Sequence, residues 1–167
     1  LAMKVIGPVH KSDVGGVALN ITDEETLLEK FHHMMNIPQT TAILMQPMLS
    51  GTQIFIGAKR EGNFGHLILC GLGGIFVETL KDINYSLSPV SREEADEMIR
   101  TLRSYRILEG TRGQEGVNIP MFSEAVRRVS ALCQAAPEIF EMDINPLMAG
   151  TRQITAVDAR IRIEKER

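Results

Sequence analysis

Three oxygen-bearing side chains near the C-terminal end of the chain are spaced so that they can bind one divalent cation. Asp143 and Asn145 lie two positions apart in an alternating segment, so their side chains point to the same face of a strand. Asp158 follows in a second alternating segment. Mg²⁺ prefers hard oxygen ligands and keeps water or phosphate oxygens, so a carboxylate, an amide and a nucleotide suit it. The pattern predicts a magnesium site, with a polar edge hairpin that only faces water as the alternative for this segment alone.

Two strands joined by a turn are needed to bring these side chains together. Glu141–Leu147 and Ala156–Ala159 have the period-two pattern of strands, and Ala149–Arg152 between them is typical of a turn. In an antiparallel pair, facing residues share a constant sum of residue numbers, and a pairing of Asn145 with Asp158 has its midpoint inside that turn. We therefore expect a hairpin in which these two side chains are neighbours.

A loop near the N-terminus has the composition of a phosphate-binding loop. Ala2–Ile6 is expected to form a short buried strand that carries Lys4, and Val17–Ile21 is expected to form the next strand. The polar loop His10–Val17 contains two adjacent glycines. Backbone amides in such a loop can wrap phosphates, and a lysine from the adjoining strand can neutralise their charge. An ordinary turn beside a solvated lysine is the alternative for this loop alone.

The remaining segments predict an α+β fold with a mostly antiparallel sheet and segregated helices. Helices are expected after capping-box patterns at Thr22–Glu25 and Ser91–Glu94, and over Met121–Ala136. Strands are expected over three further segments, which are Ala42–Gln46, Ile54–Lys59 and His66–Cys70. The first two of these strands are expected to pair around the Ser50-Gly51 turn.

The spacing of apolar residues predicts which side of each helix is buried. The expected buried positions are Leu27, Leu28, Phe31, Met34 and Met35 in the first helix, Ala95, Met98, Ile99 and Leu102 in the second, and Phe122, Ala125, Val126, Val129, Leu132 and Cys133 in the third. The histidines of the first helix, His32 and His33, are expected to lie at the surface rather than to bind a ligand.

Composition and charge exclude several classes of protein. The chain has 167 residues, of which 44% are hydrophobic and 23% charged, as in ordinary globular domains. A net charge of −3 gives no electrostatic reason to expect nucleic acid or an anionic membrane as partner. Cys70 and Cys133 are far apart and form no CxxC motif, which disfavours a disulfide scaffold or a zinc site. With no apolar run of membrane length, we expect a cytoplasmic protein.

The glycine-rich segment Gly71–Gly74 does not satisfy the dinucleotide fingerprint. That fingerprint requires GxGxxG opening a helix, whereas the residues after Gly74 have as much strand as helix character. The chain also lacks a GxSxG elbow and an HExxH helix. These motifs therefore give no support to a Rossmann dehydrogenase, a serine hydrolase of the elbow type or a zinc peptidase.

Taken together, the motifs resemble the ATP-grasp domain of the NDP-forming (ADP-forming) acyl-CoA synthetases, which are related to the succinyl-CoA synthetase beta subunit. The resemblance rests on an ordered series: Lys4, His10–Val17, Gln46–Met48, Phe64-Gly65, Gly71–Glu78, Lys81-Asp82, Thr111–Gly113 and Asp143–Leu147. It implies an ATP-grasp fold in which residues 1–50 end the first lobe and residues 51–167 form the second. Because a helix usually precedes the first strand in this family, the chain resembles a fragment of a longer polypeptide.

The resemblance implies an acid–thiol ligase that converts acid, CoA and ATP into acyl-CoA, ADP and phosphate through an acyl phosphate and a phosphohistidine. In such enzymes the CoA-binding and CoA-ligase domains, or an alpha subunit, carry the phosphohistidine and bind the acyl substrate and CoA. An oligomeric full protein is expected, and this chain by itself is expected to be inactive. Its own part would be the nucleotide half-reaction with ATP or ADP and Mg²⁺.

Individual roles also follow from the resemblance. The implied nucleotide-binding residues are Lys4, Lys11, Gly15, Gly16, Gly73 and Gly74 at the phosphates and Gln46, Pro47 and Met48 at the adenine hinge. Asn145 and Asp158 would ligate Mg²⁺, and Asp143 would orient the incoming phosphohistidine. His10 is a candidate to relay the phosphoryl group, with simple contact to phosphate or water as the alternative.

Two departures from the family pattern keep other functions open. Gln53 stands where relatives generally carry a glutamate that is expected to help position the phosphate-binding lysine, and the link between Lys4 and His10 is short. One alternative is an ATP-grasp ligase that joins an acid to an amine. The other is a non-catalytic nucleotide-sensing domain attached to an acyltransferase.

Overall fold

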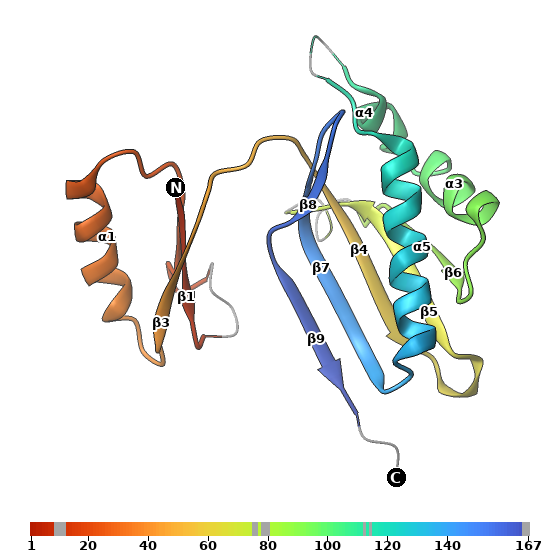
Figure 1. Cartoon of the computed structure of the whole chain (residues 1–167), viewed down its shortest axis with the longest axis horizontal. Helices are drawn as coiled ribbons and strands as arrows, with labels where there is room; N and C mark the ends of the chain where they lie inside the picture. The colour runs from red at the N-terminus through yellow and green to blue at the C-terminus, as the bar shows by residue number, and fades with distance from the viewer. Residues whose placement is uncertain (9–12, 75–76, 78–80, 112, 114, 165–167) are drawn as a thin grey trace. The chain divides into compact units, whose positions relative to one another are not determined.

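The chain forms two compact units in the computed structural model (Figure 1), which describes residues 1–8, 13–74, 77, 81–111, 113 and 115–164. Leu1–Leu49 make up the N-terminal unit and Ser50–Arg167 the C-terminal unit. Every strand pairing in the described residues is antiparallel. The predicted α+β class and the mostly antiparallel sheet are therefore confirmed.

In its described residues, the N-terminal unit consists of a three-stranded sheet and one helix. Strand β1 (Ala2–Ile6) lies between β2 (Val17–Ala18) and β3 (Ala42–Gln46). Helix α1 (Glu24–Met35) connects β2 to β3 and packs against β3. The predicted first strand is confirmed, whereas the second is shorter than the expected Val17–Ile21.

Helix α1 begins differently from the predicted capping box and buries less of its apolar side. Asp23 is the N-cap, and its Oδ1 accepts a hydrogen bond from the amide of Thr26 at 2.8 Å. Met34 is buried, but the expected positions Leu28 and Met35 are exposed. A sheet of three short strands covers only a narrow stripe of a helix, so the flanks of the apolar face remain in contact with solvent.

The C-terminal unit is built on a six-stranded sheet in the order β6-β5-β4-β7-β8, with β9 also paired to β7. The strands are β4 (Thr52–Arg60), β5 (His66–Leu72), β6 (Ile83–Leu87), β7 (Ile139–Ala149), β8 (Ile154–Ala156) and β9 (Ala159–Ile163). A 3-10 turn, η1 (Gly62–Phe64), joins β4 to β5. Strand β7 is central because it pairs with β4 on one side and with β8 and β9 on the other.

The predicted pairing of Ala42–Gln46 with Ile54–Lys59 is wrong. Strand β3 pairs with β1, with Gln46 opposite Ala2, whereas β4 pairs with β5 and β7. The Ser50-Gly51 segment is therefore a connection between two sheets and not a hairpin turn. Each strand pairs with strands of its own unit, so closeness in sequence does not decide the pairing.

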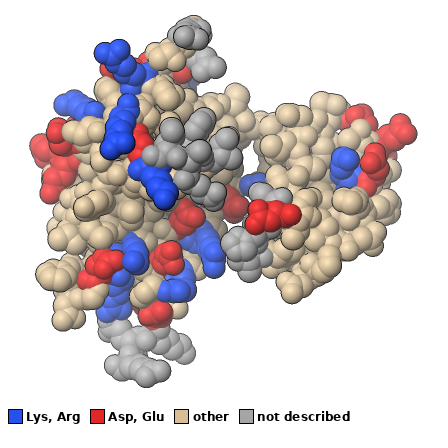
Figure 2. All heavy atoms as spheres, turned by 180° about the vertical axis from the view of Figure 1, so that it is seen from behind, with Lys and Arg blue, Asp and Glu red and all other residues tan. Residues whose placement is uncertain are grey.

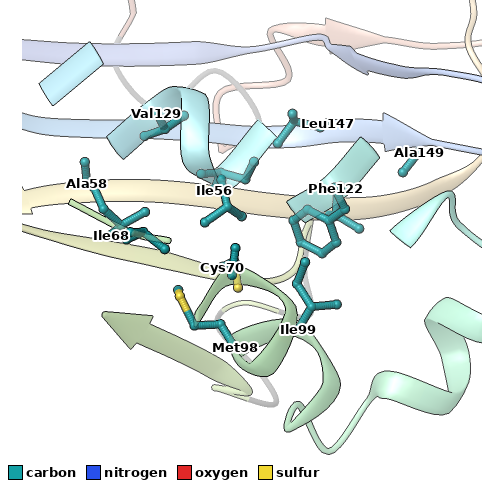
Figure 3. Close-up of a cluster of buried hydrophobic side chains, with 14 of the residues drawn as sticks. Ile56, Ala58, Ile68, Cys70, Met98, Ile99, Phe122, Val129, Leu147 and Ala149 are labelled. Carbon is teal, nitrogen blue, oxygen red and sulfur yellow. The ribbon is translucent and has the colours of Figure 1, made fainter. Parts of the chain in front are cut away.

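Among its described residues, the C-terminal unit contains the helices α3 (Arg92–Arg100), α4 (Tyr105–Glu109) and α5 (Ile119–Ala135). Helices α3 and α5 pack on each other and on the sheet, as seen in Figure 1. Figure 3 shows the resulting core, in which Phe122 and Ile99 from the helices approach Ile56, Cys70 and Leu147 of the sheet. This packing buries apolar side chains of the strands. The polar side chains of the candidate site lie on other surfaces of the same strands.

The predicted helix caps and buried faces of this unit are largely confirmed. Ser91 and Glu94 form a reciprocal capping box, with hydrogen bonds of 3.1 and 2.8 Å. The four expected core positions of the second helix are buried. Leu132 of α5 was expected to be buried but is 44% exposed, because it lies outside the stripe formed by Phe122, Val126, Val129 and Cys133.

Charged side chains of both signs are interspersed over the C-terminal unit on the face shown in Figure 2. Among the described residues, no helix has the length and apolar character that crossing a bilayer requires.

Asp82 links the loop before β6 to the start of α4. Its two carboxylate oxygens accept hydrogen bonds from the backbone amides of Arg103 at 3.0 Å and Ser104 at 2.7 Å. Burial by itself would raise the pKa of Asp82, but hydrogen bonds from Ser104 and Arg103 outweigh it and hold the pKa below its usual value. Asp82 therefore has a structural role at a helix start.

We expect Asp82→Asn to destabilise the C-terminal unit by about 1–2 kcal/mol near neutral pH. The asparagine side chain has one acceptor oxygen, so it can accept only one of the two hydrogen bonds, and its NH₂ group then faces the other backbone N–H. The lowered pKa means that the ionised Asp82 stabilises the fold above its unfolded pKa and loses this effect as the pH falls. The difference in the free energy of unfolding between wild type and variant should therefore shrink below about pH 4. Denaturant unfolding at pH 7 and pH 3 measures this difference, with Asp96→Asn on α3 as control. An equal difference at both pH values would contradict this role.

Candidate functional site

The register of β7 brings Asn145 and Asp158 together. Leu147 pairs with Ala156 in β8, and Ile144 pairs with Ala159 in β9. Between these pairs, the backbone N–H of Asn145 donates a hydrogen bond to the backbone carbonyl oxygen of Asp158, with an N···O distance of 3.2 Å. The hairpin and the adjacency expected from the sequence are confirmed, and Asp158 itself lies in the short break between β8 and β9.

Each of these two side chains is held by a backbone amide. Oδ1 of Asn145 accepts a hydrogen bond from the amide of Gly74 at 2.7 Å. Oδ1 of Asp158 accepts one from the amide of Ala159 at 3.1 Å. An amide oxygen has two lone pairs, so the contact with Gly74 fixes the orientation of Asn145 and leaves one lone pair for a cation.

Asp143 is the second carboxylate at this place. Partial burial, and then the charges of Glu141 and Asp158, raise its pKa above the usual value, while the guanidinium of Arg160 opposes the shift. Asp158, the partner of Asn145, lies on the same face of the ladder as Asp143. The site is therefore a patch of concentrated negative charge, which favours a cation or the charged form of an imidazole.

Gln53 and the predicted glycines Gly73 and Gly74 adjoin this patch. The amide of Gly73 donates a hydrogen bond to the carbonyl oxygen of Gln53 at 2.8 Å. Gly74 has a φ of +63°, and a Cβ built on it would overlap Oε1 of Gln53. The side chain of Gln53 thus packs against the same glycine whose amide orients Asn145. In this chain Gln53 lies against the glycine segment of its own unit.

A cavity of about 800 Å³ opens beside Gln53 in the C-terminal unit. The first residues of β4 and the turn between β7 and β8 form part of its wall, and Arg152 and Glu115 are its charged lining residues. Thr151 Oγ1 donates a hydrogen bond to Glu115 at 3.2 Å, which ties the turn to the segment before α5.

The residues predicted to bind phosphates from the first lobe form a second group, in the N-terminal unit. Lys4 is buried in β1, where it pairs with Val17 of β2 and Leu44 of β3. The amide of Val5 donates a hydrogen bond to the carbonyl oxygen of Gly16 at 2.9 Å. Gly15 has a φ of +70°, and a Cβ there would meet no atom within 4 Å. Lys4 and the two glycines are therefore neighbours.

The other predicted residues of this unit are placed only in part. Gln46 ends β3 opposite Ala2, and Pro47 and Met48 follow in the connection to β4. His10 and Lys11 lie outside the described residues, so their predicted roles stay predictions.

The oxygen atoms of Asn145 and Asp158 fit Mg²⁺. Among the described residues, no group of three or more histidine, cysteine, aspartate or glutamate side chains is placed to hold a metal. A single carboxylate with an amide oxygen suits a cation that takes its other ligands from phosphates and water, as Mg²⁺ does with nucleotides. A zinc or calcium site would need more protein ligands.

Sequence reasoning missed three features of this patch. Arg160 lies directly opposite Asp143 in the β7–β9 pairing, and the same constant sum that pairs Asn145 with Asp158 also gives this pair. The hydrogen bond from Gly74 to Asn145 joins residues 71 positions apart, and no local pattern signals it. The packing of Gln53 on Gly74 is equally non-local.

Comparison with known proteins identifies the family. A family described as ATP-grasp domain matches residues 1–163. The chain belongs to the ATP-grasp domain family. Antiparallel sheets flanked by a few helices, with a glycine-containing loop beside a strand lysine, are what this ATP-grasp domain shows.

Curated relatives of this ATP-grasp domain are acyl-CoA ligases. It is 37% identical to the ADP-forming acetate–CoA ligase I of Archaeoglobus fulgidus, over 99% of this chain and 26% of the relative. It is 38% identical to the ADP-forming acetate–CoA ligase I subunit beta of Pyrococcus furiosus, over 96% of this chain and 74% of that subunit. The chain thus spans about a quarter of the first relative and about three quarters of the second.

Solved structures give the same fold. This ATP-grasp domain resembles the dinucleotide forming acetyl-coenzyme A synthetase 1 of Ca. Korarchaeum cryptofilum in complex with coenzyme A and Mg-AMPPCP, with a TM-score of 0.85, 35% identity, and coverage of 98% of this chain and 76% of that one. A second complex of that protein, with coenzyme A, Ca-AMPCP and HgCl+, matches with a TM-score of 0.87 at 35% identity, and again covers 98% and 76%. Both complexes of that protein contain a nucleotide analogue and a divalent cation.

We expect Gly74→Ala to lower stability by about 1–2 kcal/mol, because a side chain at this positive φ is strained. The added Cβ should also displace the side chain of Gln53 and loosen the hydrogen bond to Asn145. Gly62→Ala is the matched control, since Gly62 also has a positive φ but has open space around the Cβ position. Thermal unfolding should show a similar loss of stability in both variants. The side-chain amide NMR signal of Asn145 should shift only in Gly74→Ala. An unchanged Asn145 signal would show that Gly74 does not orient it.

Proposed function

We propose that this chain is the nucleotide-binding part of an ADP-forming acyl-CoA synthetase, which converts acid, CoA and ATP into acyl-CoA, ADP and phosphate. The observation that carries the proposal is the pairing of Asn145 with Asp158 beside Asp143 in a chain of the ATP-grasp family. Its similarity to two ADP-forming acetate–CoA ligases supports this reaction class. The two buried free thiols fit a reducing compartment, so the proposal places the reaction in the cytoplasm.

Nucleotide binding is the first part of the proposed function. Lys4 carries a positive charge in a strand next to Gly15 and Gly16, whose loop backbone suits phosphate oxygens. Lys11, Gly73 and Gly74 are assigned to the phosphates as well, and Gln46, Pro47 and Met48 to the adenine. Asn145 and Asp158 hold Mg²⁺, which supplies neutralisation of the phosphate charge when it is bound.

Phosphoryl transfer to a histidine of a companion domain or alpha subunit is the second part. The bond between the γ-phosphorus and the β-phosphate oxygen breaks, ADP keeps the electron pair, and a bond from phosphorus to an imidazole nitrogen forms. Asp143 accepts a hydrogen bond from the other ring nitrogen, which fixes the tautomer and stabilises the charged ring. His10 is retained as a candidate relay for the phosphoryl group.

The need for a companion part is supported by two comparisons. The chain matches a quarter of a fused ligase and most of a separate beta subunit. In the Mg-AMPPCP complex of the Ca. Korarchaeum cryptofilum protein, a phosphohistidine segment points towards the nucleotide binding site. We place the acyl substrate and CoA on that companion part, and the assembled enzyme is proposed to be an oligomer.

We expect Asp158→Ala to abolish the effect of Mg²⁺ on nucleotide affinity, because the carboxylate is the charged ligand of the pair. Isothermal titration calorimetry of ADP with and without Mg²⁺ measures this effect. In the wild type Mg²⁺ should tighten binding about tenfold or more, and in the variant by less than about twofold, whereas metal-free binding should be similar in both. Asp96→Ala on α3 is the control. A full Mg²⁺ effect in Asp158→Ala would remove the metal site from this hairpin.

We expect Asp143→Asn to retain Mg·ADP binding but to slow phosphoryl transfer about 100-fold or more, because an amide cannot stabilise the charged imidazole as a carboxylate does. The measurement is the rate at which acid-labile label from γ-labelled ATP appears on the histidine of the companion part. Asp96→Asn on α3 is the control, because it removes a carboxylate away from this patch. Transfer at the wild-type rate in Asp143→Asn would contradict the role proposed for this carboxylate.

A further inference from the structure

Arg160 faces the candidate site from strand β9. The β7–β9 pairing places Arg160 opposite Asp143 and Ala159 opposite Ile144. Asn145 and Asp158 form the next contact along this ladder. Side chains directly opposite each other in an antiparallel pair lie on one face of the sheet. Arg160 therefore lies on the same face as the two carboxylates.

This face concentrates negative charge. Glu141 and Asp143 lie two positions apart on one face of β7, and Asp158 lies opposite the next residue of that face, Asn145. A nucleoside triphosphate carries several more negative charges, and its terminal phosphate has to approach Asp143 if that residue receives the acceptor histidine. Repulsion between phosphate and carboxylates has to be offset by positive charge at the same place. Arg160 supplies such a charge opposite Asp143.

The neighbouring arginine of β9 provides a contrast. Arg162 packs over the ring of Phe140, with its guanidinium carbon 4.0 Å from the ring centre, and lies 3.6 Å from Glu164. Arg160 is exposed, and within the described part of the chain its guanidinium enters no ion pair or hydrogen bond. Arg162 is thus held by its own strand and its neighbours, whereas the donors of Arg160 are available to a ligand.

We propose that Arg160 binds the terminal phosphate of a nucleoside triphosphate held at Asn145 and Asp158, so that the site distinguishes ATP from ADP. The inference rests on the proposed function and adds a residue to it. Successive pairs of facing residues on one face of a sheet are about 7 Å apart along the strands. A long arginine side chain can span this distance toward a phosphate chain held at the neighbouring pair, Asn145 and Asp158. The planar guanidinium offers two parallel donors, which match two phosphate oxygens.

The test compares the affinities of the purified protein for Mg·ADP and for the Mg complex of the methylene-bridged ATP analogue AMPPCP, by calorimetry. Arg160→Met should weaken binding of the triphosphate about 10- to 100-fold, because charge-assisted hydrogen bonds are lost, and should change ADP binding by less than about twofold. Arg160→Lys should recover part of the loss, since it keeps the charge but not the paired donors. Arg162→Met, two residues along the same strand, is the matched control and should leave both affinities within about twofold.

The possible outcomes separate this inference from the proposed function. If the wild type binds both nucleotides and Arg160→Met weakens them equally, or weakens neither, the inference is wrong and the proposed function stands. If Arg162→Met has the same selective effect, the arginines act only through long-range charge, and the assignment to Arg160 is also wrong. If the wild type binds neither nucleotide, the proposed function fails together with the inference. Thermal unfolding of each variant checks that a selective loss does not arise from unfolding.

Discussion

The pairing of β7 with the segment that forms β8 and β9 is the constraint on which the candidate site depends. This pairing places the backbone nitrogen of Asn145 3.2 Å from the backbone carbonyl oxygen of Asp158. The oxygen-bearing side chains of these two residues therefore become neighbours. A slip by one residue would turn every side chain of the segment to the other face. Met142 and Leu147 of β7 are buried against the helices, and this burial fixes the register because a slip would expose them.

The glycine segment after β5 adds rigidity to this arrangement. Gly74 orients Asn145 through a backbone hydrogen bond of 2.7 Å, and Gln53 packs on Gly74 from β4. A ligand whose orientation is already fixed loses less conformational freedom when a cation binds. Residues from three parts of the sheet therefore cooperate in holding one amide oxygen, and the neutral Gln53 does so without adding to the negative charge of Asp143 and Asp158.

Much of the fold was predictable because its signals are local. The capping box at Ser91 and Glu94, the stripe of α5 and the alternation in β7 each depend on residues within a few positions of one another. Predictions failed where the structure depends on which distant segment of the chain a strand or helix packs against. Strand β3 joins β1 and not β4, and α1 leaves Leu28 and Met35 exposed because its sheet is narrow. Neither the partner of a strand nor the area of the surface that a helix meets is written in its local pattern.

By itself the sequence determined the hairpin that brings Asn145 to Asp158, because side-chain alternation and the position of a turn together set a register. It also led us to propose which residues bind phosphates and Mg²⁺. Only the tertiary structure decided that Gly74 orients Asn145, that Gln53 packs behind it, and that Asp82 holds the start of α4. These contacts join segments far apart in the chain, and they form only once the packing of the sheet and helices has brought those segments together.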